Sequence, residues 1–106
     1  AYRMLTQDLL DLVADPARYR RLLSVGFGLF LDYAPDGRRW NGADGSANYY
    51  TPRELETSVR AALAAADEYV WIYTEAPRWW SPSGHPVDLP GEYADALRRA
   101  RGDRRR

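Results

Sequence analysis

The sequence contains no cysteine and no lysine, and its only histidine is His85. Without thiols, the chain has no disulfide framework, no zinc–thiolate site and no cysteine nucleophile. Fifteen arginines balance fifteen acidic residues, so nothing in the net charge predicts attraction to nucleic acid or to an anionic membrane. No apolar run approaches the ~20 residues of a membrane-spanning helix. No secretory signal peptide is recognisable, and both a cytoplasmic and a secreted location stay open.

What the chain does have is a globular composition. Its 106 residues are 45% hydrophobic and 13% aromatic, which fits one folded domain. Residues 1–24 are predicted to form a helical lead-in, with Thr6 as the N-cap of a helix over 5–24. Pro16 interrupts this helix because proline lacks an N–H, and Asp15 is placed to cap the second part.

Residues 25–33 are almost continuously apolar, which indicates a strand that is buried in a parallel sheet. The two faces of this strand differ. One face is large and aliphatic or aromatic and suits packing under helices: Val25, Phe27, Leu29 and Leu31. The other face begins small and ends acidic, which suits a crowded interior that opens onto a site: Gly26, Gly28, Phe30 and Asp32.

The next helix has the clearest local signal. Thr51 is predicted to cap it, Pro52 to occupy its first position, and Glu54 to complete a capping box. Before this helix, residues 34–51 form a long polar loop, whose spacing does not fit a calcium-binding loop.

A second strand, ending at Glu75, follows the helix. Tyr69, Trp71 and Tyr73 share one face with Glu75, and the glycines of the first strand would leave room for these rings. Pairing the two strands on this basis puts Asp32 and Glu75 on the same side. Residues 76–90 then form a loop, and Pro90 opens a last helix that ends at Gly102.

The element order is therefore α-β-α-β-α, and the predicted fold class is α/β with parallel strands and right-handed crossovers. Residues 1–24 are the lead-in, 25–66 the first βα unit, 67–102 the second, and 103–106 a disordered tail. Because two buried strands do not form a stable sheet alone, the chain is predicted to belong to a larger α/β protein or to complete its sheet with partner chains.

Four segments carry a family resemblance: FGLFLDY, NYYTPRELETSVRAAL, DEYVWIYTEAPRWW and LPGEYADALRRAR. From about Val25 onward, the chain resembles the C-terminal part of bacterial (β/α)8-barrel proteins (TIM barrels) of the glycoside-hydrolase type. The resemblance implies that the strands are the seventh and eighth of a barrel, and that carbohydrate is the substrate. Asp32 and Glu75 match the strand-end acids. Many barrel glycosidases place the second acid on the fourth strand, which these residues do not contain.

Glycoside hydrolysis requires two carboxyl groups, ~5–5.5 Å apart for retention and ~6.5–9.5 Å apart for inversion. Adjacent strands lie ~4.8 Å apart, so Asp32 and Glu75 are the candidate acid and nucleophile. The alternative is that each carboxylate pairs with an arginine or caps the following loop.

Aromatic and amide side chains in the loops are candidate sugar-binding groups, because flat apolar rings beside polar groups suit a sugar ring. These candidates are Trp79, Trp80, Trp40, Tyr73 and Asn41. The alternative for the tryptophans is a loop core, and Tyr73 could instead orient Glu75. His85 is interpreted as a polar surface residue, and no metal or cofactor site is predicted.

Two functions remain open. The first is a part of a carbohydrate-active barrel hydrolase. The second is a small non-catalytic α/β module, which self-associates through its sheet edges and binds a ligand or partner with its aromatic loops.

Overall fold

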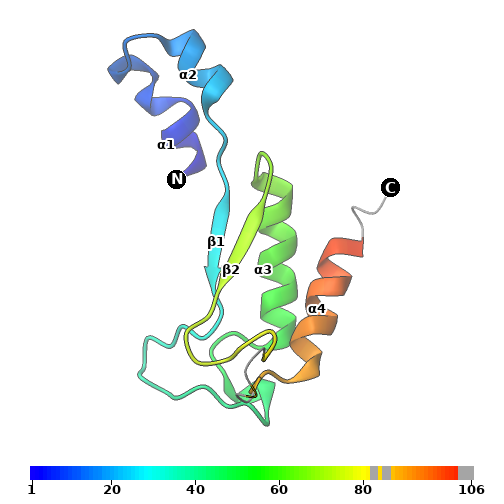
Figure 1. Ribbon diagram of the computed structural model, residues 1–106. Coiled ribbons are helices and arrows are strands. Elements are labelled where there is room, and N and C mark those ends of the chain that lie inside the picture. The colour runs from blue at the N-terminus through cyan, green and yellow to red at the C-terminus, as the bar shows by residue number, and fades with distance from the viewer. Residues whose placement is uncertain (82–83, 85–86, 103–106) are drawn as a thin grey trace.

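The computed structural model describes residues 1–81, 84 and 87–102, so the expectations for His85 and for the tail over 103–106 lie outside the described residues. In chain order, the elements are α1 (Tyr2–Thr6), the 3₁₀ helix η1 (Asp8–Leu12), α2 (Pro16–Leu22), β1 (Phe27–Phe30), the 3₁₀ helix η2 (Gly45–Ala47), α3 (Pro52–Ala65), β2 (Val70–Tyr73) and α4 (Gly91–Gly102). Figure 1 shows the lead-in helices at the amino end of the two strands and the long loops at their carboxyl end.

The two strands are parallel, as predicted, and they form a two-stranded sheet. Gly28 lies opposite Trp71, and Phe30 lies opposite Tyr73. The ladder covers four residues of each strand, which is shorter than the apolar runs in the sequence. One more hydrogen bond, from the Leu31 N–H to the Tyr73 carbonyl at 2.9 Å, extends it toward the carboxyl ends. The chain therefore has an α/β fold with a small parallel sheet.

The core lies between the sheet and two helices, α3 and α4, which are on the same side of it (Figure 1). Leu29 of β1, Leu31 just beyond its end, and Ile72 of β2 belong to this core. The buried residues at its centre are Leu31, Leu55, Val59, Tyr93 and Ala100. Leu29 and Leu31 of the predicted aliphatic face thus pack under helices, whereas Phe27 of the same face stacks on Tyr2 of the lead-in.

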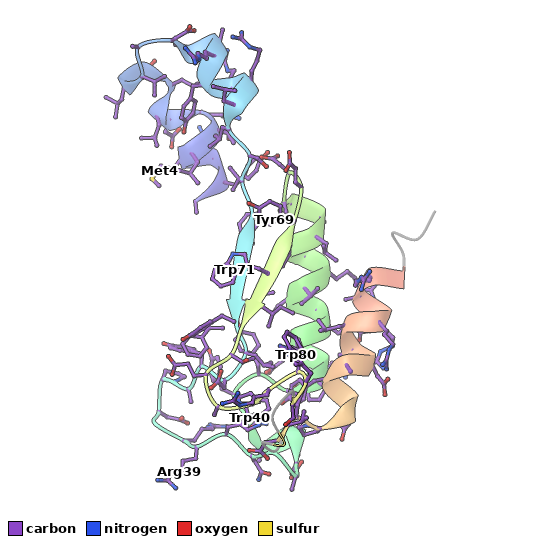
Figure 2. The ribbon with its side chains drawn as sticks, viewed as in Figure 1. Met4, Arg39, Trp40, Tyr69, Trp71 and Trp80 are labelled. Carbon is purple, nitrogen blue, oxygen red and sulfur yellow. The ribbon has the colours of Figure 1, made fainter. Side chains whose placement is uncertain are left out.

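The opposite face of the sheet is not covered by any element of the described residues. The side chains of Tyr69, Trp71 and Tyr73 on this face are 61%, 55% and 43% exposed. Figure 2 shows Trp71 on the side of the sheet away from α3. A Cβ added to Gly28 would lie 2.5 Å from the Trp71 indole, so the missing side chain is what lets this ring lie flat across β1.

The start of α3 confirms the predicted capping box. The Thr51 hydroxyl oxygen accepts a hydrogen bond from the Glu54 N–H at 3.2 Å, and the Glu54 carboxylate accepts one from the Thr51 N–H at 3.1 Å. Two orphan amides of the first turn are satisfied in this way.

The predicted start of the lead-in at Thr6 is wrong. α1 begins at Tyr2 and ends at Thr6, whose hydroxyl donates to the Tyr2 carbonyl at 2.8 Å instead of capping a later turn. The break at Pro16 is confirmed, and the Asp15 carboxylate accepts from the Arg18 N–H at 3.1 Å as the cap of α2.

The lead-in projects from the rest of the molecule. The radius of gyration is 17.1 Å, compared with about 13 Å for a compact domain of this length. Tyr2 joins the two parts: its ring stacks on Phe27 with centroids 6.5 Å apart, and its hydroxyl donates to Asp67 at 2.7 Å. The other Asp67 carboxylate oxygen accepts from the Val25 N–H at 2.7 Å, so one carboxylate connects the lead-in with the starts of both strands.

None of the helices in the described part of the chain combines the length and the apolar character that a bilayer crossing requires.

Candidate functional site

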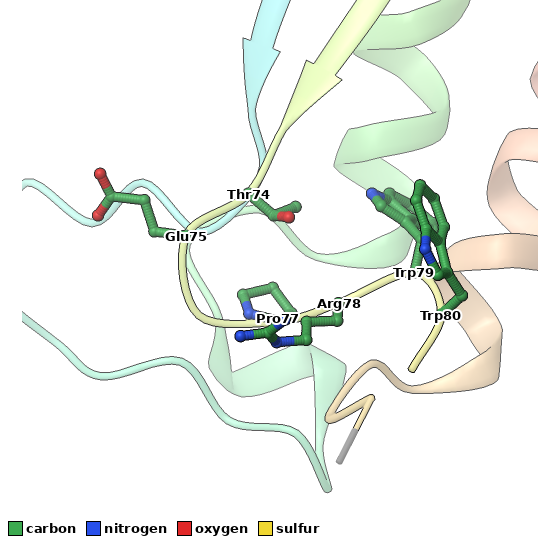
Figure 3. A pocket seen from close by; sticks show the side chains of 6 residues that line it. All are labelled: Thr74, Glu75, Pro77, Arg78, Trp79 and Trp80. Atoms are coloured by element: carbon green, nitrogen blue, oxygen red, sulfur yellow. The ribbon is translucent and has the colours of Figure 1, made fainter. Parts of the chain in front are cut away.

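A hollow of about 330 Å³ opens at the carboxyl end of β2 (Figure 3). It is lined by Thr74, Glu75, Pro77, Arg78, Trp79 and Trp80. Because the strands are parallel, both of them end at this edge of the sheet. The carboxyl ends of the strands are where α/β proteins bind their ligands. The hollow is therefore the candidate functional site.

Glu75 is an exposed carboxylate at one side of the hollow. The Tyr73 hydroxyl donates to one of its oxygens at 3.1 Å, so the structure shows Tyr73 in the orienting position that the sequence suggested. This hydrogen bond, then burial, then the Glu75 charge raise the pKa of Tyr73 above its ordinary value of 10.0. In Figure 3 the Glu75 side chain extends away from the two tryptophans.

Asp32 follows β1 and lies beside the end of β2. Its two carboxylate oxygens accept hydrogen bonds from the backbone N–H groups of Glu75 and Ala76, each at 2.9 Å. These amides lie beyond the last residue of the ladder, where no strand of the described residues pairs with them. Asp32 has thus adopted the loop-capping arrangement, the alternative to a chemical role, and it positions the backbone that carries Glu75.

The two tryptophans of the loop have different surroundings. Trp79 is partly buried and packs against the hydrophobic core, whereas Trp80 is 71% exposed. Both lie across the hollow from Glu75 in Figure 3. Trp79 therefore contacts the core and also lines the hollow, whereas the Trp80 ring is open to solvent.

Trp40 and Asn41 do not line this hollow. The Trp40 ring packs against Tyr93 with centroids 5.2 Å apart, and its indole N–H donates to the Asp88 carbonyl at 2.7 Å. The Asn41 side-chain oxygen accepts from the N–H groups of Ala43 and Asp44, at 2.9 and 2.8 Å. Both residues hold the loop over 34–51 in place and do not contact the space beside Glu75.

Arg78 is a lining residue that the sequence interpretation did not single out. Its N–H donates to the Val87 carbonyl at 2.7 Å, and the preceding Pro77 is fully buried. An arginine between a buried proline and two tryptophans, three residues after a strand-end acid, was the signal that could have identified it.

Within the described ranges, no group of three or more histidine, cysteine, aspartate or glutamate side chains is arranged to hold a metal ion. In comparisons with known proteins, the chain matches no protein-family model, no curated protein and no solved structure.

Proposed function

We propose that this chain forms part of a carbohydrate-active (β/α)8-barrel hydrolase of the glycoside-hydrolase type, in which Glu75 is a reacting carboxylic acid. The observation that carries the proposal is the hollow at the carboxyl end of β2, where Glu75 and two tryptophans line one space. Carboxyl groups and flat apolar rings around one space are the groups that glycosidic bond cleavage and sugar binding use, and here a sugar on the tryptophans would reach across the hollow to Glu75.

The uncovered sheet face supports the barrel. In such a barrel, helices cover the outside of the sheet and side chains from its inner face fill the interior. Here α3 and α4 cover one face, and Trp71 and Tyr73 remain exposed on the other. Neighbouring strands on both sides of the pair would satisfy the free backbone groups at its edges and bury these rings.

The hydrogen bonds of Asp32 support different roles for the two acids. Both of its oxygens accept from backbone amides, and in this proposal Asp32 has the role of positioning Glu75. Since glycoside hydrolysis requires a second carboxyl group, a barrel strand outside these residues, such as the fourth, supplies it. Trp80 stacks on a sugar ring and Trp79 supports it from the core side.

The test is hydrolysis of an oligosaccharide panel by the intact protein and by its Glu75→Gln variant. We expect turnover to fall by at least about 100-fold, because proton transfer or nucleophilic attack by the carboxyl group is lost. Glu68→Gln is the matched control, since Glu68 is an exposed glutamate at the opposite end of β2. Unchanged turnover in Glu75→Gln, or an equal loss in Glu68→Gln, would rule out the assignment.

The two-stranded sheet of the described residues, with an edge on each strand and an exposed aromatic face, also favours a second candidate. This is a non-catalytic module whose copies pair through their sheet edges, so that the Trp71 rings of adjoining copies lie on one continuous face, and which binds a ligand or partner with its aromatic loops. In that case the protein is a stable oligomer, it has no turnover, and Trp71→Arg dissociates it. Sedimentation of the intact protein and of this variant separates the two candidates, because a monomeric protein excludes the module.

A further inference from the structure

We infer that the hollow binds a saccharide that carries an acidic group, with the Arg78 guanidinium pairing with the carboxylate or sulfate of the sugar. The inference rests on the proposed function and names the substrate class of the same site.

Arg78 brings a positive charge to the hollow. Within the part of the chain that the structure describes, no hydrogen bond or ion pair engages its guanidinium, and it lines the same space as Trp79 and Trp80. Arg38 and Arg99 differ from it, because their guanidinium groups are bound to Asp36 and Glu56 at 2.6 and 2.8 Å. The hollow therefore holds a cation that is available to an anionic ligand.

Among the described residues that line the hollow, Glu75 is the one acidic residue. Its carboxylate accepts from the Tyr73 hydroxyl, and its side chain extends away from the tryptophans (Figure 3). No ion pair joins it to Arg78. A bound sugar that stacks on Trp80 therefore has the arginine within the same hollow and the carboxylate at its far side.

The backbone that carries Arg78 has partners of its own within the chain. Pro77 before it is buried, and the Arg78 N–H is bound to the Val87 carbonyl. The backbone of Arg78 is thus already held by neighbouring residues before a ligand binds, which lowers the entropic cost of the contact. Guanidinium binds carboxylate and sulfate oxygens with two parallel N–H groups, a geometry that a neutral hydroxyl does not match.

The experiment compares three oligosaccharide probes on the intact protein by isothermal titration calorimetry. These are trigalacturonate, its uncharged methyl ester and a sulfated galacto-oligosaccharide of similar length. We expect an acidic probe to bind at least about tenfold more tightly than the methyl ester, which is the size of one charge-assisted contact. Whichever acidic probe binds more tightly identifies the anion as carboxylate or sulfate. Raising the salt concentration should reduce this preference.

Two variants of Arg78 and one control locate the effect. Arg78→Gln should bring the ratio of the affinities for the acidic probe and the methyl ester close to one, whereas Arg78→Lys should keep part of the preference. Arg20→Gln, an exposed arginine on α2 at the far end of the molecule, should change neither. If Arg78→Gln does not fold, Arg78→Lys and the salt dependence of the unmodified protein still test the inference.

The possible outcomes distinguish a failure of this inference from a failure of the proposed function. If the methyl ester binds as tightly as the acidic probes, the inference is overturned and the proposed function stands. If the preference persists in Arg78→Gln, Arg78 is not its source and the inference is also overturned. If no saccharide binds and none is hydrolysed, both the inference and the proposed function fail.

Discussion

One oxygen of the Asp32 carboxylate lies 2.9 Å from the backbone nitrogen of Glu75, and its other oxygen lies 2.9 Å from that of Ala76. The acid that follows β1 thus fixes the chain that carries the acid following β2. Backbone amides near the end of a strand need a partner when the ladder stops, and here one carboxylate provides it for two of them.

We expect Asp32→Asn to lower the free energy of unfolding by about 1–2 kcal/mol, because an amide oxygen can accept from one of the two N–H groups while its NH₂ group faces the other. Urea denaturation measures the loss. Asp36→Asn is the control, since it removes an exposed ion pair with Arg38, and its effect should be smaller. Equal losses in the two variants would show that the hydrogen bonds that Asp32 accepts from the two backbone amides do not stabilise the fold.

The hydrogen bond between Tyr73 and Glu75 makes a prediction about alkaline titration. It is the main reason why the pKa of Tyr73 is raised above 10.0, so Glu75→Gln should bring this pKa back toward its ordinary value. A group with a raised pKa in the folded state contributes stability below its unfolded pKa and loses that contribution as the pH rises through the folded pKa. The alkaline loss of stability should therefore be smaller in Glu75→Gln.

NMR of ring-labelled tyrosine, with Tyr73→Phe to assign the signal, measures this pKa. Glu68→Gln should leave it unchanged. A Tyr73 pKa that is the same with and without the Glu75 carboxylate would show that the two side chains are not in contact in solution.

The contact between Tyr2 and Asp67 should control how firmly the lead-in is held. The Tyr2 hydroxyl, and after it the Val25 N–H, lower the pKa of Asp67 below 3.8. A lowered pKa contributes stability above the unfolded pKa and loses it as the pH falls through the folded pKa, so the lead-in should loosen in acid. Tyr2→Phe should produce the same loosening at neutral pH.

Hydrogen exchange followed by mass spectrometry measures this effect. We expect faster exchange over residues 2–22 in Tyr2→Phe, and unchanged exchange in α3, which packs in the core. Faster exchange in both regions would mean that Tyr2 stabilises the whole fold and not the attachment of the lead-in.

The buried hydroxyl of Tyr93 should contribute measurably to stability. It accepts from the Asn48 side-chain amide at 3.0 Å and lies 2.7 Å from the Tyr50 carbonyl, to which it donates. Tyr93→Phe leaves these partners unsatisfied in the core, and we expect a loss of about 1–3 kcal/mol in chemical denaturation. Tyr49→Phe, at a residue that is 44% exposed, should have little effect.

Local signals in the sequence were sufficient for much of the fold. Thr51 and Glu54 form the capping box, and Asp15 caps α2, because each involves partners three residues apart in the chain. The glycines of the first strand, beside the large rings of the second, also predicted the pairing of the strands. The structure places Gly28 opposite Trp71, whereas Tyr73 lies opposite Phe30 and not opposite a glycine.

The surroundings of the site depend on contacts between distant segments and could not be predicted. Trp40 is a loop tryptophan like Trp80, and only its partner Asp88, in the other long loop, places it away from the hollow. Asp32 is a strand-end acid like Glu75, and only the amides beyond β2 assign it a different role. Composition and spacing do not contain these partners.

The contact between Trp40 and Asp88 also ties together the two loops that follow β1 and β2. Gly42 lies against the same aspartate, and a side chain added to Gly42 would collide with its carboxylate. Because Asp88 directly follows Val87, which accepts from Arg78, the wall of the hollow is braced from behind by a segment of the other βα unit. A ligand that displaced the backbone of Arg78 would therefore also disturb, through Val87 and Asp88, the segment that carries Trp40.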